Sequence, residues 1–81
     1  MKIYILHFAQ MDSEGNLSID CKKYSSIEDA KSAQTDLNNS FRELVSHNTG
    51  DIIFEEIGLF NRLAIKSSPA EIQSHIEEFE F

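Results

Sequence analysis

The 81-residue sequence contains one cysteine, one proline, three glycines and no tryptophan. A single thiol, Cys21, rules out an intramolecular disulfide and is typical of proteins in a reducing cytosol, so we expect a cytoplasmic location. No stretch approaches the roughly 20 apolar residues that a membrane-spanning helix needs, and we expect no membrane association. The length predicts a single domain over residues 1–81 with a small hydrophobic core.

Basic residues are also scarce: seven Lys and Arg face fourteen Asp and Glu, giving a formal net charge of −7. The imbalance is strongest in residues 51–81, which hold two basic and seven acidic residues. Such a surface repels phosphate backbones, so we expect no nucleic-acid partner. It would attract a basic protein, although plain solubility explains the same charge.

Motifs that carry catalysis or cofactor binding are missing. The three glycines stand singly, without a phosphate-binding loop, and no serine lies in a Gly-x-Ser-x-Gly turn. His7 and Cys21 could face each other on neighbouring strands, but a zinc site needs more ligands and a Cys–His nucleophile needs an orienting third group. Adjacent carboxylates on one element point apart. We therefore predict no enzyme, no catalytic or metal-binding residues and no cofactor.

One long helix is the clearest element of the sequence. Between Ser25 and Gly50, apolar residues recur in steps of three and four: Ile27, Ala30, Ala33 or Gln34, Leu37, Phe41 and Leu44/Val45. Ser25 or Ser26 can cap the start, and Gly50 suits the end. The polar middle of this stretch, Thr35 to Ser40, is expected to lie mostly off the apolar stripe.

Four strands are expected around this helix. Residues 2–11 carry apolar side chains on both faces, and residues 17–24 alternate in polarity after a turn at Gly15 and Asn16. Residues 51–57 are rich in β-branched and aromatic side chains, and residues 60–66 alternate. Each pair predicts a β-hairpin.

The last segment is ambiguous. Ser68, Pro69 and Glu71 resemble a helix start, and Ile72, Ile76 and Phe79 keep helical spacing, which favours a short helix over residues 69–79. A strand over residues 76–81 is the alternative. The predicted fold is thus an α+β two-layer sandwich with the order β-β-α-β-β-α. It has a largely antiparallel four-stranded sheet, as in the ferredoxin-like layer arrangement, with one long and one short helix on one face.

The first strand poses a problem that this architecture does not solve. Helices on one side cannot cover both of its apolar faces, so its second face meets another molecule or is covered by turns and the C-terminal segment. We predict an interaction surface on that side, made of apolar residues together with acidic residues from the second half of the chain: Ile3, Ile5, Glu55, Glu56, Phe60, Glu77, Glu78, Phe79, Glu80 and Phe81.

Residues 60–76, Phe-Asn-Arg-Leu-Ala-Ile-Lys-Ser-Ser-Pro-Ala-Glu-Ile-Gln-Ser-His-Ile, resemble the third strand and second helix of the subtilisin-propeptide family. This resemblance covers about a quarter of the chain. It implies a ferredoxin-like domain that acts as an intramolecular chaperone or protease inhibitor, with its C-terminal tail in the protease cleft. The chain departs from the family in an extra strand before the first helix and in Arg62, where a small residue is usual. In general layout the chain also resembles inhibitors carried by phages and mobile elements.

Taken together, the sequence predicts a small acidic, non-enzymatic protein–protein interaction domain that regulates or inhibits a partner. The partner is another protein or a second copy, the latter through the open sheet face. The alternative is a small-ligand-binding domain with a pocket between the sheet and the long helix.

Overall fold

The computed structural model describes residues 1–46 and 51–81, which form five strands and one helix. All strand pairings are antiparallel. The elements, in chain order, are β1 (Lys2–Met11), β2 (Leu17–Tyr24), α1 (Ile27–Leu44), β3 (Ile52–Ile57), β4 (Phe60–Ile65) and β5 (Glu71–Glu80).

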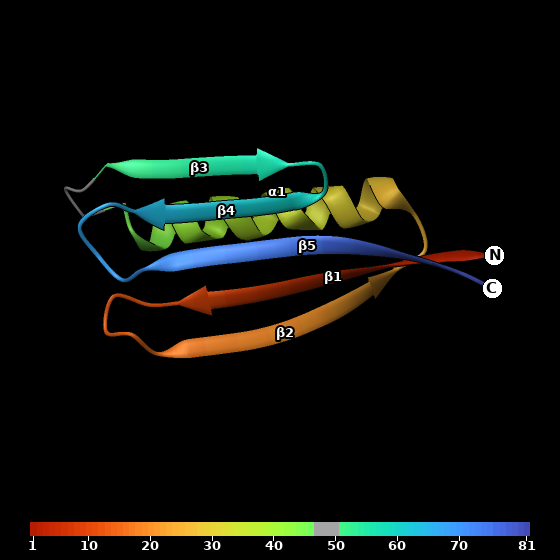
Figure 1. Cartoon of the computed structure of the whole chain (residues 1–81), viewed down its shortest axis with the longest axis horizontal. Coiled ribbons are helices and arrows are strands. Elements are labelled where there is room, and N and C mark those ends of the chain that lie inside the picture. The colour runs from red at the N-terminus through yellow and green to blue at the C-terminus, as the bar shows by residue number, and fades with distance from the viewer. Residues whose placement is uncertain (47–50) are drawn as a thin grey trace.

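The strands form one sheet in the order β2-β1-β5-β4-β3. Figure 1 shows α1 on one side of this sheet, with the chain ends side by side at one end of β1 and β5. The two ends are joined by hydrogen bonds, because the Phe81 amide donates to the Met1 carbonyl oxygen at 2.7 Å and the Met1 ammonium donates to the Phe81 carbonyl oxygen at 3.1 Å. The C-terminal strand thus lies in the centre of the sheet, between β1 and β4.

The predicted four-stranded sheet with two helices is wrong, because the segment predicted as the second helix is the strand β5. Positions four apart, such as Ile72 and Ile76, share a face in a strand as well as in a helix, so their spacing does not separate the two structures. The side chains of Ile72, Ser74 and Ile76 are buried, while those between them are more exposed. This period of two is the signature of a strand that is covered on one face.

The serine-rich segment before β5 is a turn and not a helix start. The Ser68 amide donates to the Ile65 carbonyl oxygen at 3.2 Å, and the Ser68 hydroxyl accepts from the Ala70 amide two residues later at 3.2 Å. Serine, followed by proline, therefore performs its other common role of organising a tight turn.

The helix α1 forms where the sequence predicted it, with Ser26 as its N-cap. The Ser26 hydroxyl accepts from the Asp29 amide at 3.1 Å, as expected of a capping serine. The stripe follows the prediction: among the polar residues from Thr35 to Ser40 one, Asn38, is buried, and of the Leu44/Val45 pair Val45 is buried while Leu44 is 52% exposed. The predicted end at Gly50 lies outside the described residues.

The helix packs on the sheet through two apolar clusters. Its first half contributes Ala30 to a cluster with Leu6 of β1 and Ile76 of β5. Its last turns contribute Phe41 and Val45 to a cluster with residues of β4, β5 and the turn before β5, namely Leu63, Ile65, Ala70 and Ile72. Leu37 packs against both clusters. The helix therefore packs on β1 and β5 through one cluster and on β4 and β5 through the other.

Buried polar side chains also connect the helix with the sheet. The Gln34 amide nitrogen donates to the Ser74 hydroxyl at 3.0 Å and to the Leu59 carbonyl oxygen at 3.2 Å. One turn on, the Asn38 amide nitrogen donates to the Asn61 side-chain oxygen at 3.2 Å, in the Asn61 orientation that satisfies both ends of its amide. These side chains are at most 6% exposed. We call Gln34, Asn38, Asn61 and Ser74 the amide seam.

The seam predicts that Gln34→Ala destabilises the fold. The substitution leaves the buried Ser74 hydroxyl without this donor, which costs about 1–3 kcal/mol of unfolding free energy. Urea denaturation followed by circular dichroism measures the change. Thr35→Ala, at the exposed neighbouring position, is the control and should change the free energy by less than about 0.5 kcal/mol. Equal stabilities for the two variants would contradict the role of the seam.

Candidate functional site: the open face of the sheet

One face of the sheet is covered by α1, and the other face is not. Side chains alternate along each strand, so Tyr4, Leu6 and Phe8 of β1 point toward α1 and their neighbours point away. No element among residues 1–46 and 51–81 lies over the far side, which we call the open face. Strand by strand it comprises Ile3, Ile5, His7, Ala9 and Met11; Leu17, Ile19, Cys21 and Lys23; Ile53, Glu55 and Ile57; Phe60, Arg62 and Ala64; and Glu71, Gln73, His75, Glu77 and Phe79.

The open face is largely apolar and close to neutral. It bears three carboxylates and two cations, a net charge of −1 with neutral histidines, whereas the chain as a whole carries −7. The remaining −6 therefore lies on the helix side, the edges and the turns. An apolar, nearly neutral sheet face on a strongly acidic domain is the feature that distinguishes this side of the molecule.

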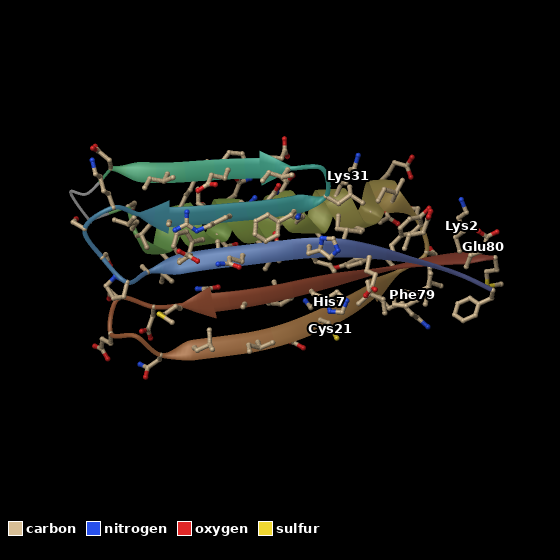
Figure 2. The ribbon with its side chains drawn as sticks, in the orientation of Figure 1. Lys2, His7, Cys21, Lys31, Phe79 and Glu80 are labelled. Atoms are coloured by element: carbon tan, nitrogen blue, oxygen red, sulfur yellow. The ribbon has the colours of Figure 1, made fainter. Side chains whose placement is uncertain are left out.

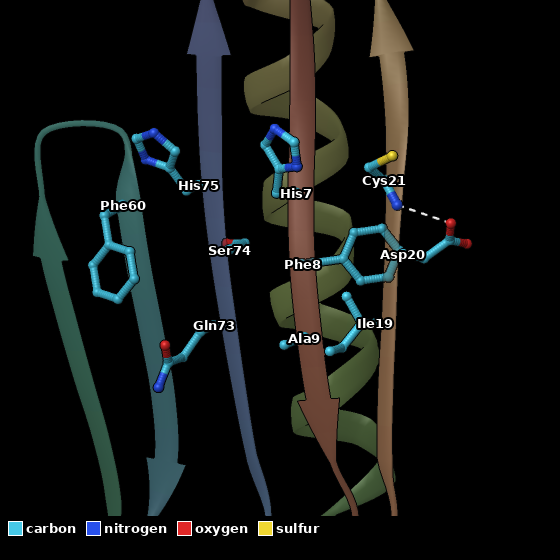
Figure 3. A pocket seen from close by; sticks show the side chains of 10 residues that line it. All are labelled: His7, Phe8, Ala9, Ile19, Asp20, Cys21, Phe60, Gln73, Ser74 and His75. Atoms are coloured by element: carbon cyan, nitrogen blue, oxygen red, sulfur yellow. Dashed lines mark hydrogen bonds between the residues drawn. The ribbon is translucent and has the colours of Figure 1, made fainter.

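One row of side chains crosses the open face from strand to strand. The pairing places His7 opposite both Cys21 of β2 and His75 of β5, and it places His75 opposite Phe60 of β4. Figure 2 shows His7 and Cys21 beside each other with α1 behind the sheet. The row lines a shallow groove of about 510 Å³, with Ala9, Ile19 and Gln73 as further lining side chains (Figure 3).

The polar members of the row have defined partners or lie exposed. His7 Nε2 lies 3.1 Å from Glu77 Oε1, on the neighbouring strand β5. Cys21 is a free, exposed thiol. Within the part of the chain that the structure describes, no three His, Cys, Asp or Glu side chains are arranged to hold a metal ion. The groove is therefore a surface with hydrogen-bonding side chains in an apolar setting, and its histidines and thiol do not form a metal centre.

A second polar group on the open face is centred on Arg62 of β4. Its guanidinium donates to Glu55 Oε1 at 2.6 Å and to Glu71 Oε1 at 2.9 Å, which connects β3, β4 and β5. The bond from Arg62, followed by one from Gln73, lowers the pKa of the Glu71 carboxyl below its usual 4.5. The same two carboxylates raise the pKa of Arg62. Arg62 thus offsets one of the two carboxylate charges, and the group keeps a net charge of −1.

The structure separates the predicted interaction residues onto two sides of the sheet. Six lie on the open face: Ile3, Ile5, Glu55, Phe60, Glu77 and Phe79. Glu56, Glu78 and Glu80 lie on the helix side, where Glu78 accepts a hydrogen bond from the Tyr4 hydroxyl at 3.2 Å. Phe81 follows the end of β5 and is 77% exposed. Lys2, Phe79 and Glu80 mark the end of the sheet where the termini meet (Figure 2).

The sequence indicated the His7–Cys21 pair but missed His75 and the Arg62 network. His75 lies within residues 69–79, which the sequence predicted as a helix, and a helix would not align it with His7 across a strand pair. A signal for the strand was available, because Glu71, Gln73, His75 and Glu77 alternate with Ile72, Ser74 and Ile76. The odd-numbered positions are polar and the even-numbered positions are mainly apolar, which is typical of a strand with one buried face.

The helix side offers less room for a ligand. A hollow of about 220 Å³ lies between α1 and the strands β1 and β2, lined by Leu6, Phe8, Lys22, Tyr24, Ala33, Asp36, Leu37 and Ser40. This volume is below the 300–1,000 Å³ that is common for small-molecule sites. Among residues 1–46 and 51–81 there is no helix long and apolar enough to cross a bilayer.

Comparison of the chain with protein-family models, with curated proteins and with solved structures finds no match. The segment that resembled the second helix of the subtilisin-propeptide family is the strand β5. The resemblance therefore does not extend to the fold, and the geometry of the open face carries the functional argument.

The Arg62 network predicts a loss of stability in acid. Because the pKa of folded Glu71 is lowered, its ionised form contributes stability above pH 4.5. This contribution is lost as the pH falls through the lower pKa of the folded state. Glu71→Gln should reduce the unfolding free energy by about 0.5–1 kcal/mol at pH 7 and flatten its fall below pH 4.5.

Denaturant titrations between pH 7 and pH 3 measure this dependence. The control is Glu14→Gln, because Glu14 is exposed and its carboxylate contacts no cation among the described residues. If Glu71→Gln and the unmodified chain lost stability in parallel below pH 4.5, the ion pair would not contribute as described.

Proposed function

We propose that this chain is a non-enzymatic protein-binding domain that uses the open face to bind, and thereby regulate or inhibit, a partner protein. The observation that carries the proposal is the absence of cover over that face within residues 1–46 and 51–81, although apolar side chains occupy much of it. Apolar surface of this extent on a small domain is typical of interaction sites. The proposed partner is a basic protein that presents an apolar patch.

The polar groups of the open face are compatible with burial against a partner. A charge that loses its water without a counterpart costs several kcal/mol, whereas a charge already paired within the domain costs less to cover. Arg62 is already paired with two carboxylates, and the Glu77 carboxylate already has a hydrogen-bonding partner in His7. These contacts would persist in a complex, so the partner needs to supply mainly apolar surface at the centre of the face.

The charge outside the open face supports a basic partner. Carboxylates along the rim and the helix side give the domain a long-range negative potential, which speeds the encounter with a cationic protein and is weakened by salt. The same potential disfavours nucleic acid. Protein binding is also preferred to the ligand-binding alternative, because the hollow between sheet and helix measures only about 220 Å³.

Site-specific photocrosslinking in native cells tests the proposal. A photoreactive amino acid replaces His75, which lies exposed in the groove, or Ser32, which lies exposed on α1. We expect a discrete adduct with another protein from position 75 and none from position 32. Adding Ile19→Lys, which places a charge at an exposed position of the groove, should reduce the adduct at least about tenfold, since a charge would be buried in the interface.

The other outcomes have distinct meanings. No adduct from position 75, or equal adducts from both positions, would refute a binding site on the open face. An adduct at twice the 9.3 kDa mass would identify a second copy as the occupant, the other partner that the sequence predicted, and would refute a foreign basic protein.

A further inference from the structure

The sheet has two edges, and they differ in how well their backbone is protected. On β2, Asp20 Oδ1 accepts from the Cys21 amide at 2.8 Å, and Lys22 and Lys23 follow directly. A side chain that occupies an edge amide and adjacent lysines are both means by which natural sheets prevent further strand pairing. On β3, the other edge, residues 52–57 include neither lysine nor proline.

The edge strand β3 is also apolar and uncovered on both faces. Ile52, Ile53, Phe54 and Ile57 are between 37% and 72% exposed. From the helix, Arg42 reaches this strand, with its guanidinium carbon 5.5 Å from the centre of the Phe54 ring. An exposed apolar edge strand of this kind is a template for pairing with another strand.

The pairing with β4 defines which backbone groups of β3 point outward. The Lys66 amide donates to the Asp51 carbonyl oxygen at 2.9 Å, so Asp51 directs its backbone groups toward β4. Residues alternate in this respect along an antiparallel strand. The N–H and C=O groups of Ile52, Phe54 and Glu56 therefore point away from the sheet. No hydrogen bond from residues 1–46 or 51–81 reaches these groups.

We propose that β3 pairs edge to edge with β3 of a second copy, antiparallel and with Phe54 opposite Phe54 on a two-fold axis. This register pairs all three outward N–H groups and all three outward C=O groups of each strand. It places Ile52 opposite Glu56 of the second copy and Ile53 opposite Glu55, so no carboxylate faces another. Both helices then lie on the same side of one continuous sheet.

Neighbouring registers fit less well. A shift of two residues in one direction places Glu55 opposite Glu55, where like charges repel. A shift in the other direction leaves the outward groups of Glu56 without partners from β3 and places Asp51 opposite Glu55. The sequence of the edge strand is thus self-complementary in one register. This pairing uses different residues from the groove of the open face and does not depend on the function proposed for it.

Amide hydrogen exchange of the unmodified chain, followed by NMR between about 10 µM and about 1 mM, tests the proposal in the range where a small interface assembles. The mass from sedimentation should rise from 9.3 kDa toward twice that value. Over the same range the amides of Ile52, Phe54 and Glu56 should become protected. The amides of Ile53 and Glu55 are internal controls, because β4 already binds them in the monomer.

Phe54→Lys places two charges opposite each other on the two-fold axis and should weaken self-association at least about tenfold. Ser18→Lys adds a lysine at an exposed position of the protected edge strand β2, outside the groove, and should leave self-association unchanged. Because Ile19→Lys impairs the groove and Phe54→Lys impairs the β3 edge, the two proposals fail separately. Circular dichroism establishes that each variant folds. If Phe54→Lys does not fold, the exchange data on the unmodified chain decide.

Three results would overturn self-pairing. One is a monomer throughout the concentration range. Another is a dimer in which exchange at Ile52, Phe54 and Glu56 does not change, which would assign the contact to another surface. The third is protection of these amides only on addition of a different protein, which would assign the edge to a foreign strand.

Discussion

One helix covers one face of a five-stranded sheet, and this shortage of cover determines the rest of the structure. An 18-residue helix is about 27 Å long and about 10 Å wide, while five strands span about 19 Å between the axes of the outer two. Along its length α1 packs on β1, β5 and β4, whereas β3 is exposed at every position. The opposite face of the sheet receives no cover from the described residues.

A helix with so limited a contact area needs a specific position, and the amide seam supplies it. Apolar clusters alone tolerate sliding, because burial of surface is non-directional. Hydrogen bonds between Gln34 and Ser74, and between Asn38 and Asn61, are satisfied in one placement of the helix on the sheet. The seam lies between the two apolar clusters. Its hydrogen bonds therefore define the rotation and translation of the helix relative to the sheet at both clusters.

The sequence predicted each element that had a distinctive period or cap. The helix capped by Ser26, the double-sided strand β1 and the hairpin of β3 and β4 form where expected. The prediction was wrong at Ile72 and Ile76, because residues four positions apart lie on the same face in a helix and in a strand. The prediction that β1 is apolar on both faces does fit its place inside the sheet, where it pairs with β2 along one edge and with β5 along the other. The candidate site was only partly predictable, because His75 and Arg62 join it through strand pairing between distant segments.

The distribution of charge reconciles an apolar open face with a strongly acidic chain. Nearly all of the net −7 lies away from the open face, so two copies that approach at random meet carboxylates and repel each other. Contacts through the open face bring weakly charged, apolar surface together, and contacts through the β3 edge in the proposed register keep the carboxylates of the two strands from facing each other. On the open face Arg62 is paired with Glu55 and Glu71, and Glu77 has a hydrogen-bonding partner in His7, which lowers the cost of burying these groups. In the interactions proposed above, the negative charge elsewhere on the domain would therefore direct association to the open face and the β3 edge.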